Sequence, residues 1–552
     1  MLNRLSMSFF FLMFILIFGT FSSSQISYGA YSKAPPSPTG PVINDARLTV
    51  EKVTDGLKYP TSMAFLGPND ILVTEKNTGT VVEIRDGKIQ PNPVLDVNVA
   101  YAIERGLLGI ALSTQSDGKT YAFIYYTESG GSKDGDDFTG NVEPAGNRLY
   151  RYEYINGELV NPIRLLDLPA TPQNNRGEHI GGKVLIGPDN NIYLVIGEVG
   201  AHRTEAQNVN GGPAADGTGG ILRITQDGQV VPGGNTFGSE LPLSIYYAVG
   251  IRNSFGMDFD PVTGNLWDTE NGPTLGDEVN LVRQGFNSGW AQIQGYAKDN
   301  IMNNGASEND LVKLGNSQYS DPKFVFNTPI GITDAKFLNS DKLGKEYANN
   351  LFVGDINNGY LYRLNLNDNR DGITINNTTY VGDLTMLSDN KVDSPKESEP
   401  IIFGQGFGGI TDLEVGPDGY LYVLTYPGSL YRIMPSSESS APQNTPGTAA
   451  QNNPPVAPAD AIQAKIVGIQ GQASYSPEPI EINAGQAVTW YNDDAISHTV
   501  TSGSAGDSAS GADFDSNAIL SKQSFSLIFD GPGYYDYYCI YHPSMVGTIH
   551  VR

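Results

Sequence analysis

The sequence contains a single cysteine, Cys539, among its 552 residues. A lone cysteine cannot close an intramolecular disulfide. The thiol is therefore inert packing, the site of an intermolecular link, or a metal ligand. Its surroundings favour the last of these, because the stretch "YYCIYHPSM" places His542 three residues after the cysteine and Met545 three residues after that.

Positive charge is also scarce. The chain has 34 Lys and Arg against 60 Asp and Glu, which gives a formal net charge of −26. Such a surface repels the phosphates of nucleic acids and the headgroups of anionic membranes, so neither is expected as a partner. The simplest alternative is that the acidic shell only keeps the protein in solution.

Long apolar runs are lacking except near the N-terminus. Arg4 precedes an apolar run from Ser8 to Gly19, and small residues follow up to Ala30. This pattern predicts a signal peptide over residues 1–30. The run is shorter than the ~20 residues of a membrane span, although an uncleaved N-terminal anchor is the alternative. In both cases we expect the rest of the chain to lie outside the cytoplasm, secreted or at the cell surface.

Glycine and proline, by contrast, are abundant, with 64 and 34 residues, and they separate many short Val, Ile and Tyr runs. This composition is typical of an all-β protein. Residues 31–46 form a Pro-rich leader. Residues 435–460 contain no aromatic residue and one valine, too few apolar groups to fold, and predict a disordered linker. The linker separates a body, 47–434, from a C-terminal module, 461–552.

The body repeats one plan, in which an alternating apolar strand meets a Pro/Asp/Asn/Gly turn and a second strand returns. It occurs in Ser62–Glu75, Gly182–Glu198, Gly256–Glu270 and Thr411–Tyr426. Recurrence of such a hairpin predicts a β-propeller. About 390 residues at ~65 per blade give six blades with large loops. A series of β-sandwiches is the alternative.

The C-terminal module carries a set of copper ligands. Electron-transfer copper takes one thiolate, two imidazoles and a weak axial thioether. Cys539, His542 and Met545 supply three of them from one loop, and His498 supplies the fourth from the end of a distant strand. Zinc is poorly served by a thioether. A zinc site and a module without metal are the alternatives.

On these residues the module, over residues 462–552, resembles a cupredoxin, the small β-sandwich of blue-copper proteins. Its short C-x-x-H-x-x-M loop resembles that of amicyanin. The resemblance implies one type 1 copper ion held by His498, Cys539, His542 and Met545, and electron transfer to or from another redox protein.

The body has motifs of its own. "EHIGG" places His179 before Gly181 and Gly182, which allow a close approach of the backbone. Arg252 and Asn253 stand together at the start of a predicted strand. The stretch "TENGPTLGDE" is rich in carboxylates and carbonyls, which suits a hard cation such as calcium.

Together with "ERGLLGIAL" (Glu104–Leu112), these motifs resemble the soluble quinoprotein family of glucose, aldose-sugar and sorbosone dehydrogenases, over nearly all of residues 47–434. The resemblance implies a six-bladed propeller that holds pyrroloquinoline quinone (PQQ) and calcium near its axis. It also implies a histidine that removes the proton of the sugar's anomeric hydroxyl while hydride passes to the quinone.

The resemblance assigns roles to individual residues. His179 matches the general base, and Glu198 takes the place of an aspartate that orients it. Arg252 and Asn253 match residues that contact the quinone, and Arg252 would stabilise the charge that develops on it. The calcium loop is matched by Gly272, Pro273 and Asp277.

Four positions depart from the family's pattern. The family's cofactor-binding lysine falls at Asn357, two arginines fall at Gly409 and Thr411, and a glutamine falls at Glu104. PQQ is a tricarboxylate, and each lost cation removes a charge-assisted hydrogen bond of roughly 1.5–3 kcal/mol. Arg203 could replace part of this charge.

Two functions therefore stand side by side. In the first, an exported oxidoreductase oxidises a sugar or other alcohol in the propeller and passes electrons singly through the tethered copper to an external acceptor. A tether raises the effective concentration of the copper module to roughly millimolar. In the second, the propeller lacks quinone and binds a glycan or a partner, the cupredoxin transfers electrons for another protein, and His179 and Arg252 are structural.

Overall fold

The computed structural model describes residues 40–436, except 141, 174–175, 376–386 and 388, and the segments 461–468, 471–494, 498–503, 514, 516, 519, 524–529, 531–539 and 545–552. The predicted signal peptide, most of the leader and linker, and His542 lie outside these residues. In the part of the chain so described, no helix has the length and apolar character of a membrane span.

The all-β prediction is confirmed. In the described residues the only α-helix is α1 (Asp136–Thr139). Short 3-10 turns occupy η1 (Glu205–Gln207), η2 (Leu243–Ile245), η3 (Ala297–Asp299), η4 (Met302–Asn304), η5 (Glu308–Asp310), η6 (Pro395–Ile401) and η8 (Gly471–Ser474).

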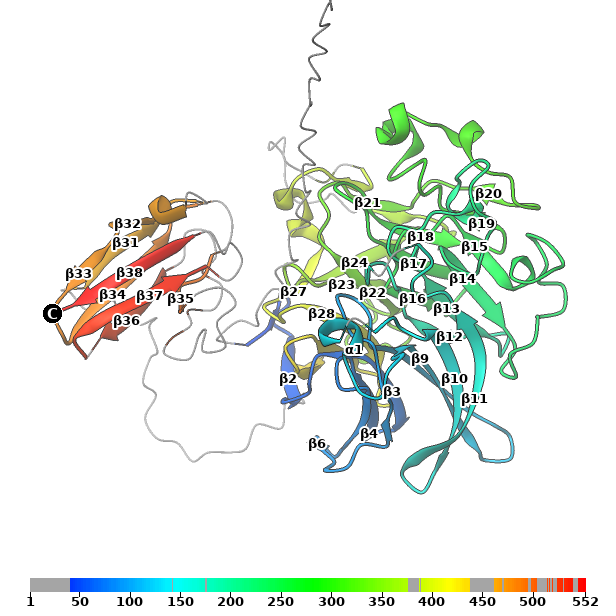
Figure 1. Ribbon diagram of the computed structural model, residues 1–552, viewed down its shortest axis with the longest axis horizontal. Helices are drawn as coiled ribbons and strands as arrows, with labels where there is room; N and C mark the ends of the chain where they lie inside the picture. The colour runs from blue at the N-terminus through cyan, green and yellow to red at the C-terminus, as the bar shows by residue number, and fades with distance from the viewer. Residues whose placement is uncertain are drawn as a thin grey trace, which may run out of the picture. The chain divides into compact units, whose positions relative to one another are not determined.

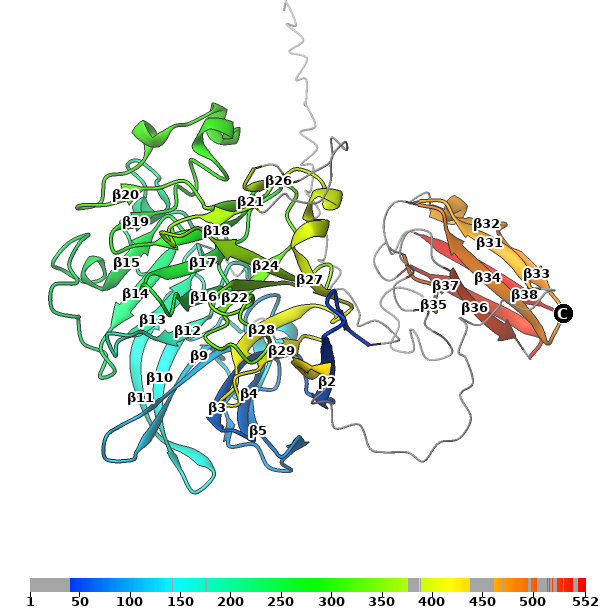
Figure 2. The ribbon, with the colours of Figure 1, turned by 180° about the vertical axis from the view of Figure 1, so that it is seen from behind.

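The body folds into six sheets, which we number as blades 1 to 6 (Figures 1 and 2). Blade 1 contains β3 (Pro60–Gly67), β4 (Asp70–Glu75), β5 (Thr80–Arg85), β6 (Lys88–Ile89) and β7 (Leu95–Asp96). Blade 2 contains β8 (Leu107–Thr114), β9 (Thr120–Glu128), β10 (Gly146–Ile155) and β11 (Glu158–Leu168). Blade 3 contains β12 (Val184–Ile186), β13 (Ile192–Ile196), β14 (Gly220–Ile224), β15 (Tyr246–Val249), β19 (Phe286–Asn287) and β20 (Gln318–Tyr319).

The remaining blades follow the same antiparallel plan in their first three strands. Blade 4 contains β16 (Gly256–Phe259), β17 (Leu266–Glu270), β18 (Asp277–Val282), β21 (Phe324–Phe326) and β26 (Lys391–Val392). Blade 5 contains β22 (Ile332–Phe337), β23 (Leu351–Asp355), β24 (Leu361–Leu366), β25 (Ile373–Thr374), β27 (Ile402–Gln405) and β1 (Val42–Ile43). Blade 6 contains β28 (Ile410–Val415), β29 (Leu421–Thr425), β30 (Leu430–Pro435) and β2 (Leu48–Thr54).

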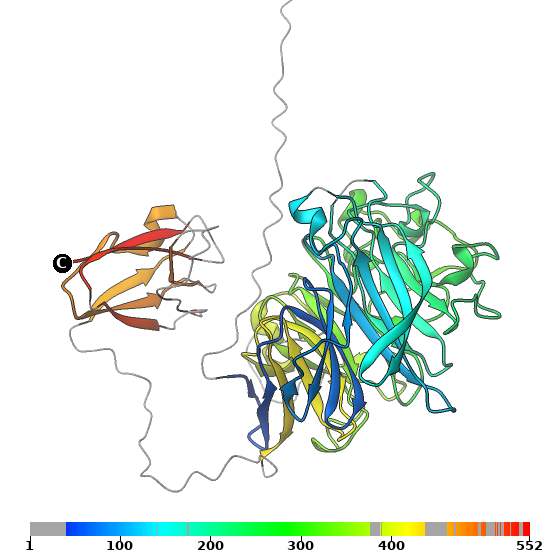
Figure 3. The ribbon, with the colours of Figure 1, turned by 60° about the horizontal axis from the view of Figure 1, so that its bottom comes forward.

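The two ends of the body meet in blade 6. The N-terminal strand β2 pairs antiparallel with β30, so the last blade contains the first long strand of the chain. Figure 3 shows blue β2 beside the yellow strands of this blade. Val42, in the predicted leader, pairs with Gln405, and Pro435, the first residue of the predicted linker, is the last residue of β30.

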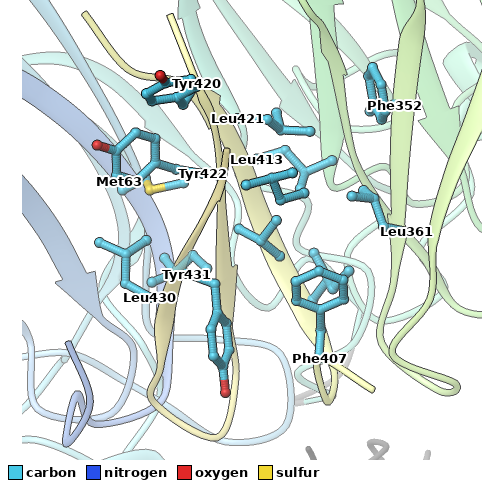
Figure 4. Packing of buried hydrophobic residues seen from close by; sticks show 14 of the residues in the cluster. Met63, Phe352, Leu361, Phe407, Leu413, Tyr420, Leu421, Tyr422, Leu430 and Tyr431 are labelled. Atoms are coloured by element: carbon cyan, nitrogen blue, oxygen red, sulfur yellow. The ribbon is translucent and has the colours of Figure 1, made fainter. Parts of the chain in front are cut away.

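Apolar clusters lie between consecutive blades and close the ring. Separate clusters join blades 1 and 2, blades 2 and 3, blades 3 and 4, and blades 4 and 5. A further cluster joins blades 5, 6 and 1. Figure 4 shows part of it, with Phe352 and Leu361 from blade 5, Leu413 from blade 6 and Met63 from blade 1. The six-bladed propeller predicted from the repeated hairpins is therefore confirmed.

The first strand of each blade is its inner strand, and these strands neighbour one another around the axis. Strand β3 contacts both β8 and β28, β8 contacts β12, and β22 contacts β16 and β28. Residues just before the inner strands, and turns between the second and third strands, therefore share one face of the propeller. We call this the entry face, because the candidate site lies on it.

Below this face, a buried ion-pair network fills the axis. Lys183 Nζ lies 2.8 Å from Asp334 Oδ2 of blade 5 and 2.6 Å from Asp412 Oδ1 of blade 6. Burial by itself lowers the pKa of Lys183, but the charges of the two aspartates hold it well above its ordinary value. The network ties blades 3, 5 and 6 together and fixes the segment that carries His179.

The C-terminal module is a sandwich of two sheets, as predicted. One sheet contains β31 (Ile462–Ile466), β32 (Tyr475–Ser476), β34 (Gln486–Asn492) and β36 (Ser524–Phe529). The other contains β33 (Ile480–Ile482), β35 (Thr501–Ser502), β37 (Gly533–Tyr538) and β38 (Val546–Val551). Between them, the buried rings of Trp490 and Tyr537 have centroids 5.6 Å apart. Cys539 follows β37 directly, and Met545 directly precedes β38.

Candidate functional site

His179 and Glu198 form the centre of the propeller site. His179 stands before inner strand β12 and Glu198 after β13, and pairing of these two strands brings their ends together. Nδ1 of His179 lies 3.0 Å from Oε1 of Glu198. Gly197 makes this approach possible, because a Cβ atom there would lie 2.6 Å from the His179 carbonyl oxygen. Nε2 of His179 has no hydrogen bond to any described residue, which leaves it available to a ligand.

The carboxylate of Glu198 is buried but well supplied with donors. Its Oε2 accepts hydrogen bonds from Trp290 Nε1 at 2.8 Å and from Arg203 Nε at 3.1 Å. Burial alone would raise the pKa of Glu198, but His179, Arg203 and Trp290 together hold it below its ordinary value. Glu198 is therefore ionised at neutral pH and can orient the imidazole and stabilise its protonated form.

Glu104, one of the four departures, supports the turn that carries His179. Its Oε2 accepts the backbone N–H of His179 at 2.6 Å and Nδ2 of Asn253 at 3.1 Å. Asn253 Oδ1 in turn accepts the N–H of Gly181 at 3.2 Å. Asn253, predicted to contact the quinone, thus also supports the His179 turn from the neighbouring blade.

Arg252 keeps a buried donor without a partner among the described residues. Its Nη1 donates to the carbonyl oxygens of Asn271 and Gly272, at 2.9 and 3.2 Å. Its guanidinium lies 5.4 Å from the Trp290 ring centroid, and that of Arg203 lies 4.9 Å from it. Nε of Arg252 is buried and has no hydrogen-bond partner among the described residues. A buried donor without a partner is costly, so this atom suits an acceptor supplied by a ligand.

The predicted calcium loop is tied together by its own aspartate. Asp277 Oδ1 accepts the N–H of Gly272 at 2.9 Å, and Oδ2 accepts the backbone N–H groups of residues 330, 331 and 332 at 2.8, 2.9 and 3.0 Å. Burial raises the pKa of Asp277 to about 6. Among the described residues, no group of three or more His, Cys, Asp or Glu side chains is placed to hold a metal ion. Calcium at Gly272, Pro273 and Asp277 stays a prediction.

The three other departures leave the blade 5 and blade 6 side of the entry face without the family's cations. Oδ1 of Asn357 is buried and has no hydrogen-bond partner among the described residues. A Cβ atom on Gly409 would lie 2.8 Å from the Ile356 carbonyl oxygen, so the backbone packs too closely there for a long side chain. Thr411 Oγ1 donates to the carbonyl oxygen of Leu424 at 3.3 Å.

In the C-terminal module, two predicted copper ligands face each other. Sγ of Cys539 and Nδ1 of His498 are 3.9 Å apart, and both residues are fully buried. The N–H of Thr499 donates to Sγ at 3.3 Å, and Asp494 Oδ2 lies 2.8 Å from Nε2 of His498. The buried thiol and the Nδ1 atom of an oriented imidazole that faces it fit a soft metal.

The rest of the predicted copper site is described only in part. Met545 is fully buried, and its carbonyl oxygen accepts the N–H of Cys539 at 3.0 Å, so both ends of the ligand loop lie together. His542 lies outside the described residues. The copper assignment rests on the other three ligands.

Two residues at these sites were missed by the sequence reasoning. Trp290 donates a hydrogen bond to Glu198, and the guanidiniums of Arg203 and Arg252 both lie near its ring. Nothing in the local sequence distinguishes it except that the chain has just 3 tryptophans. Asp494, four residues before His498, contacts Nε2 of that histidine and orients its ring. The set of copper ligands predicted from the sequence includes no residue at that position.

Comparisons with known proteins agree with this division of the chain. A family model described as Glucose / Sorbosone dehydrogenase matches residues 57–432, and one described as copper binding proteins, plastocyanin/azurin family, matches residues 462–552. The aldose sugar dehydrogenase YliI of Escherichia coli strain K12 is 26% identical over 396 residues, covering 71% of this chain and 94% of that protein.

The copper module and the propeller each have a further similar protein. Amicyanin-alpha of Methylorubrum extorquens is 38% identical over 98 residues, covering 17% of this chain and 76% of that protein. The solved PQQ-bound form of an aldose sugar dehydrogenase from Streptomyces coelicolor has a TM-score of 0.50 and 20% identity, and the match covers 71% of this chain and 99% of that one. At this identity the likeness is one of fold.

Proposed function

We propose that this chain, which belongs to the glucose/sorbosone dehydrogenase family and carries a C-terminal copper-binding domain of the plastocyanin/azurin family, oxidises a sugar in its propeller and passes the electrons to its own copper centre. The observation that carries the proposal is the contact of 3.0 Å between the partly buried His179 and the buried Glu198 on the entry face. In the family resemblance these are the proton-accepting pair.

The chain's own residues supply a proton acceptor in a fixed position. Glu198 holds Nδ1 of His179, so Nε2 points away from it and can take the hydroxyl proton of the sugar. The negative charge of Glu198 stabilises the imidazolium that results. Glu104 fixes the backbone of the same turn and so sets where Nε2 lies.

The similar Streptomyces protein was solved in a PQQ-bound form, and a quinone bound here would accept the hydride of the alcohol, which carries both electrons, while His179 takes the hydroxyl proton. The site fits this group through the unpartnered Nε of Arg252 and through Arg203, whose guanidinium lies near the same Trp290 ring. It offers no cation at Asn357, Gly409 or Thr411. We therefore expect weaker PQQ binding than in a site with all three cations, because each missing bond is worth roughly 1.5–3 kcal/mol.

A quinone would take up two electrons from the sugar, and the copper module would accept these electrons from it one at a time. The ion would be held by His498, Cys539 and Met545, together with His542 as predicted. Because the linker joins the copper module to the propeller of the same chain, the effective concentration of copper at that propeller is high. From there we propose transfer to an external redox protein. We also propose that the chain works outside the cytoplasm, as the N-terminal pattern suggests.

The test of this function uses the whole protein loaded with copper. PQQ is titrated into it by calorimetry in the presence of calcium, and aldose sugars are then added while the visible absorption of the copper is followed. We expect binding in the micromolar range and sugar-dependent bleaching of the copper band. If PQQ does not bind at high micromolar concentration, the result would favour the second function, in which the propeller binds a glycan or a partner, over sugar oxidation.

Calcium in the loop formed by Gly272, Pro273 and Asp277 gives a separate prediction. Saturating calcium at 100 times its Kd would stabilise the fold by ~2.7 kcal/mol, and a chelator would lower the melting temperature of the propeller by a few degrees. The measurement is scanning calorimetry of the whole Cys539→Ser protein, in which the chelator cannot act by removing copper. An unchanged transition at saturating calcium would exclude the site.

A further inference from the structure

The buried ion-pair network on the propeller axis contains more carboxylates than cations. Among the described residues it has two lysines and four carboxylates, which are Lys183, Lys336, Asp258, Asp334, Asp412 and Glu414. If every group were ionised, the network would carry two negative charges in excess. Like charges held close together repel strongly in the interior, because little water is there to screen them. Something bound within the network must therefore offset the excess.

The six groups differ in their access to water. We call Lys183, Asp334 and Asp412 the inner trio and the other three groups the outer trio. The side chains of the inner trio are 3%, 0% and 1% exposed. In the outer trio Lys336 Nζ lies 2.7 Å from Glu414 Oε2, and these two side chains are 13% and 19% exposed. Water can solvate the outer trio but not the inner one, so the inner trio has to neutralise its extra carboxylate in another way.

The two aspartates of the inner trio differ in their hydrogen-bond donors. Asp412 uses both oxygens, because Oδ1 accepts Lys183 Nζ at 2.6 Å and Oδ2 accepts the N–H of Met63 at 2.7 Å. Asp334 uses only Oδ2, which accepts Lys183 Nζ at 2.8 Å and the N–H of Leu413 at 2.9 Å. Its Oδ1 is buried and has no hydrogen-bond partner among the described residues. A buried ionised oxygen without a donor is costly, which makes Asp334 the group that binds a proton.

The charges around Asp334 lead to the same assignment. Burial raises the pKa of Asp334 well above its ordinary value of 3.8, and the neighbouring Asp412 carboxylate raises it further, although Lys183 lowers it. Glu414, from the same strand as Asp412, acts in the same direction as Asp412. On β16, the other inner strand that packs against β22, the charged residue is Asp258 of the outer trio. The cation of the inner trio is thus outnumbered on this side of the axis.

The inner trio joins blades that are far apart in the chain. Asp334 of blade 5 binds the backbone of blade 6, and Asp412 of blade 6 binds the backbone of blade 1. Lys183 reaches both aspartates from blade 3. Blade 6 is also where the two ends of the body meet. We infer that Asp334 and Asp412 share one bound proton and that this proton locks the ring of blades closed, independently of quinone, sugar and copper.

Such a lock gives the propeller a pH dependence of definite sign. In the unfolded chain Asp334 ionises near its ordinary pKa of 3.8, whereas in the folded chain it keeps its proton. Unfolding between about pH 5 and pH 7 therefore releases this proton, and the stability of the fold decreases as the pH rises towards the pKa of the folded state. One released proton corresponds to an increase of about tenfold in the unfolding equilibrium constant per pH unit.

The first experiment measures denaturant unfolding of the whole protein between about pH 5 and pH 7. Asp334→Asn imitates the protonated group, because the amide is uncharged, of the same shape, and both a donor and an acceptor. The matched control is Asp260→Asn. Burial raises the pKa of Asp260, but Arg370, 2.7 Å away, holds it below its ordinary value. We expect the unfolding constant of the wild type to rise about tenfold more per pH unit than that of Asp334→Asn, and Asp260→Asn to keep the wild-type slope.

A second measurement reads the proton in the folded state and does not require reversible unfolding. The infrared C=O stretch of protonated carboxylic acids is compared at neutral pH between the wild type and the variants. We expect Asp334→Asn to lose one such band and Asp260→Asn to lose none. Asp412→Asn, in which Asp334 can ionise beside Lys183, should lose the same band.

Two kinds of result would overturn the lock. One is an equal pH slope in the wild type and Asp334→Asn, or an infrared band that both proteins keep. The other is a wild-type stability that changes with sodium or calcium at constant ionic strength while that of Asp334→Asn does not, because a cation would then occupy the inner trio.

Discussion

Replacing Cys539 by serine is expected to abolish the intense visible absorption of the copper-loaded protein. That absorption arises from charge transfer between a thiolate and copper, and Cys539 is the only thiol in the chain. The side chain is fully buried beside His498 and Thr499, and a serine there is nearly isosteric, so the fold should persist. The measurement is an absorption spectrum of wild type and variant after copper addition, together with the metal content of each.

The matched control is Met545→Leu. It removes the weak axial thioether but keeps the thiolate, so the band should remain while the reduction potential rises. Asp494→Asn, which alters only the partner of His498 Nε2, should likewise keep the band. A visible band that survives in Cys539→Ser would show that the ligand set is wrong, since no second thiol could account for it.

The features that sequence predicted well are the local ones. The hairpins that open blades 1, 3, 4 and 6 have alternating strands and a turn with Gly, Pro, Asn or Asp, so each pattern lies within one short stretch of the chain. Cys539 and Met545 also belong to one loop. His498 comes from a distant strand and was proposed because ligand chemistry requires a second imidazole, and the fold brings its Nδ1 to 3.9 Å from Cys539 Sγ.

The features that sequence did not predict depend on pairs far apart in the chain. Lys183 meets Asp412, 229 residues away, and Trp290 donates to Glu198, 92 residues away. Nothing near either residue indicates its partner. The role of Glu104 was hidden for another reason. As a substitution in a family pattern it suggested only the loss of a contact, whereas the fold uses its carboxylate to hold the backbone of His179.

Replacing His179 by asparagine is expected to lower sugar oxidation by ~10²–10⁴-fold, the usual contribution of a general base. Asparagine is chosen because the backbone at residue 179 has a φ of 60°, which asparagine tolerates better than alanine. The turn itself is held by backbone contacts to Glu104, so it should stay in place. Turnover is measured with a dye acceptor, and PQQ binding by calorimetry, with binding expected to be nearly unchanged.

Glu198→Gln is the graded control for the same step. It keeps a hydrogen-bonding group beside His179 Nδ1 but removes the charge that stabilises the imidazolium, so its loss should be smaller than that of His179→Asn. Arg252→Gln, by contrast, removes the donor assigned to the cofactor and should weaken PQQ binding as well as turnover. If His179→Asn binds PQQ and turns over at the wild-type rate, the propeller still oxidises sugars, but the proton leaves through another group.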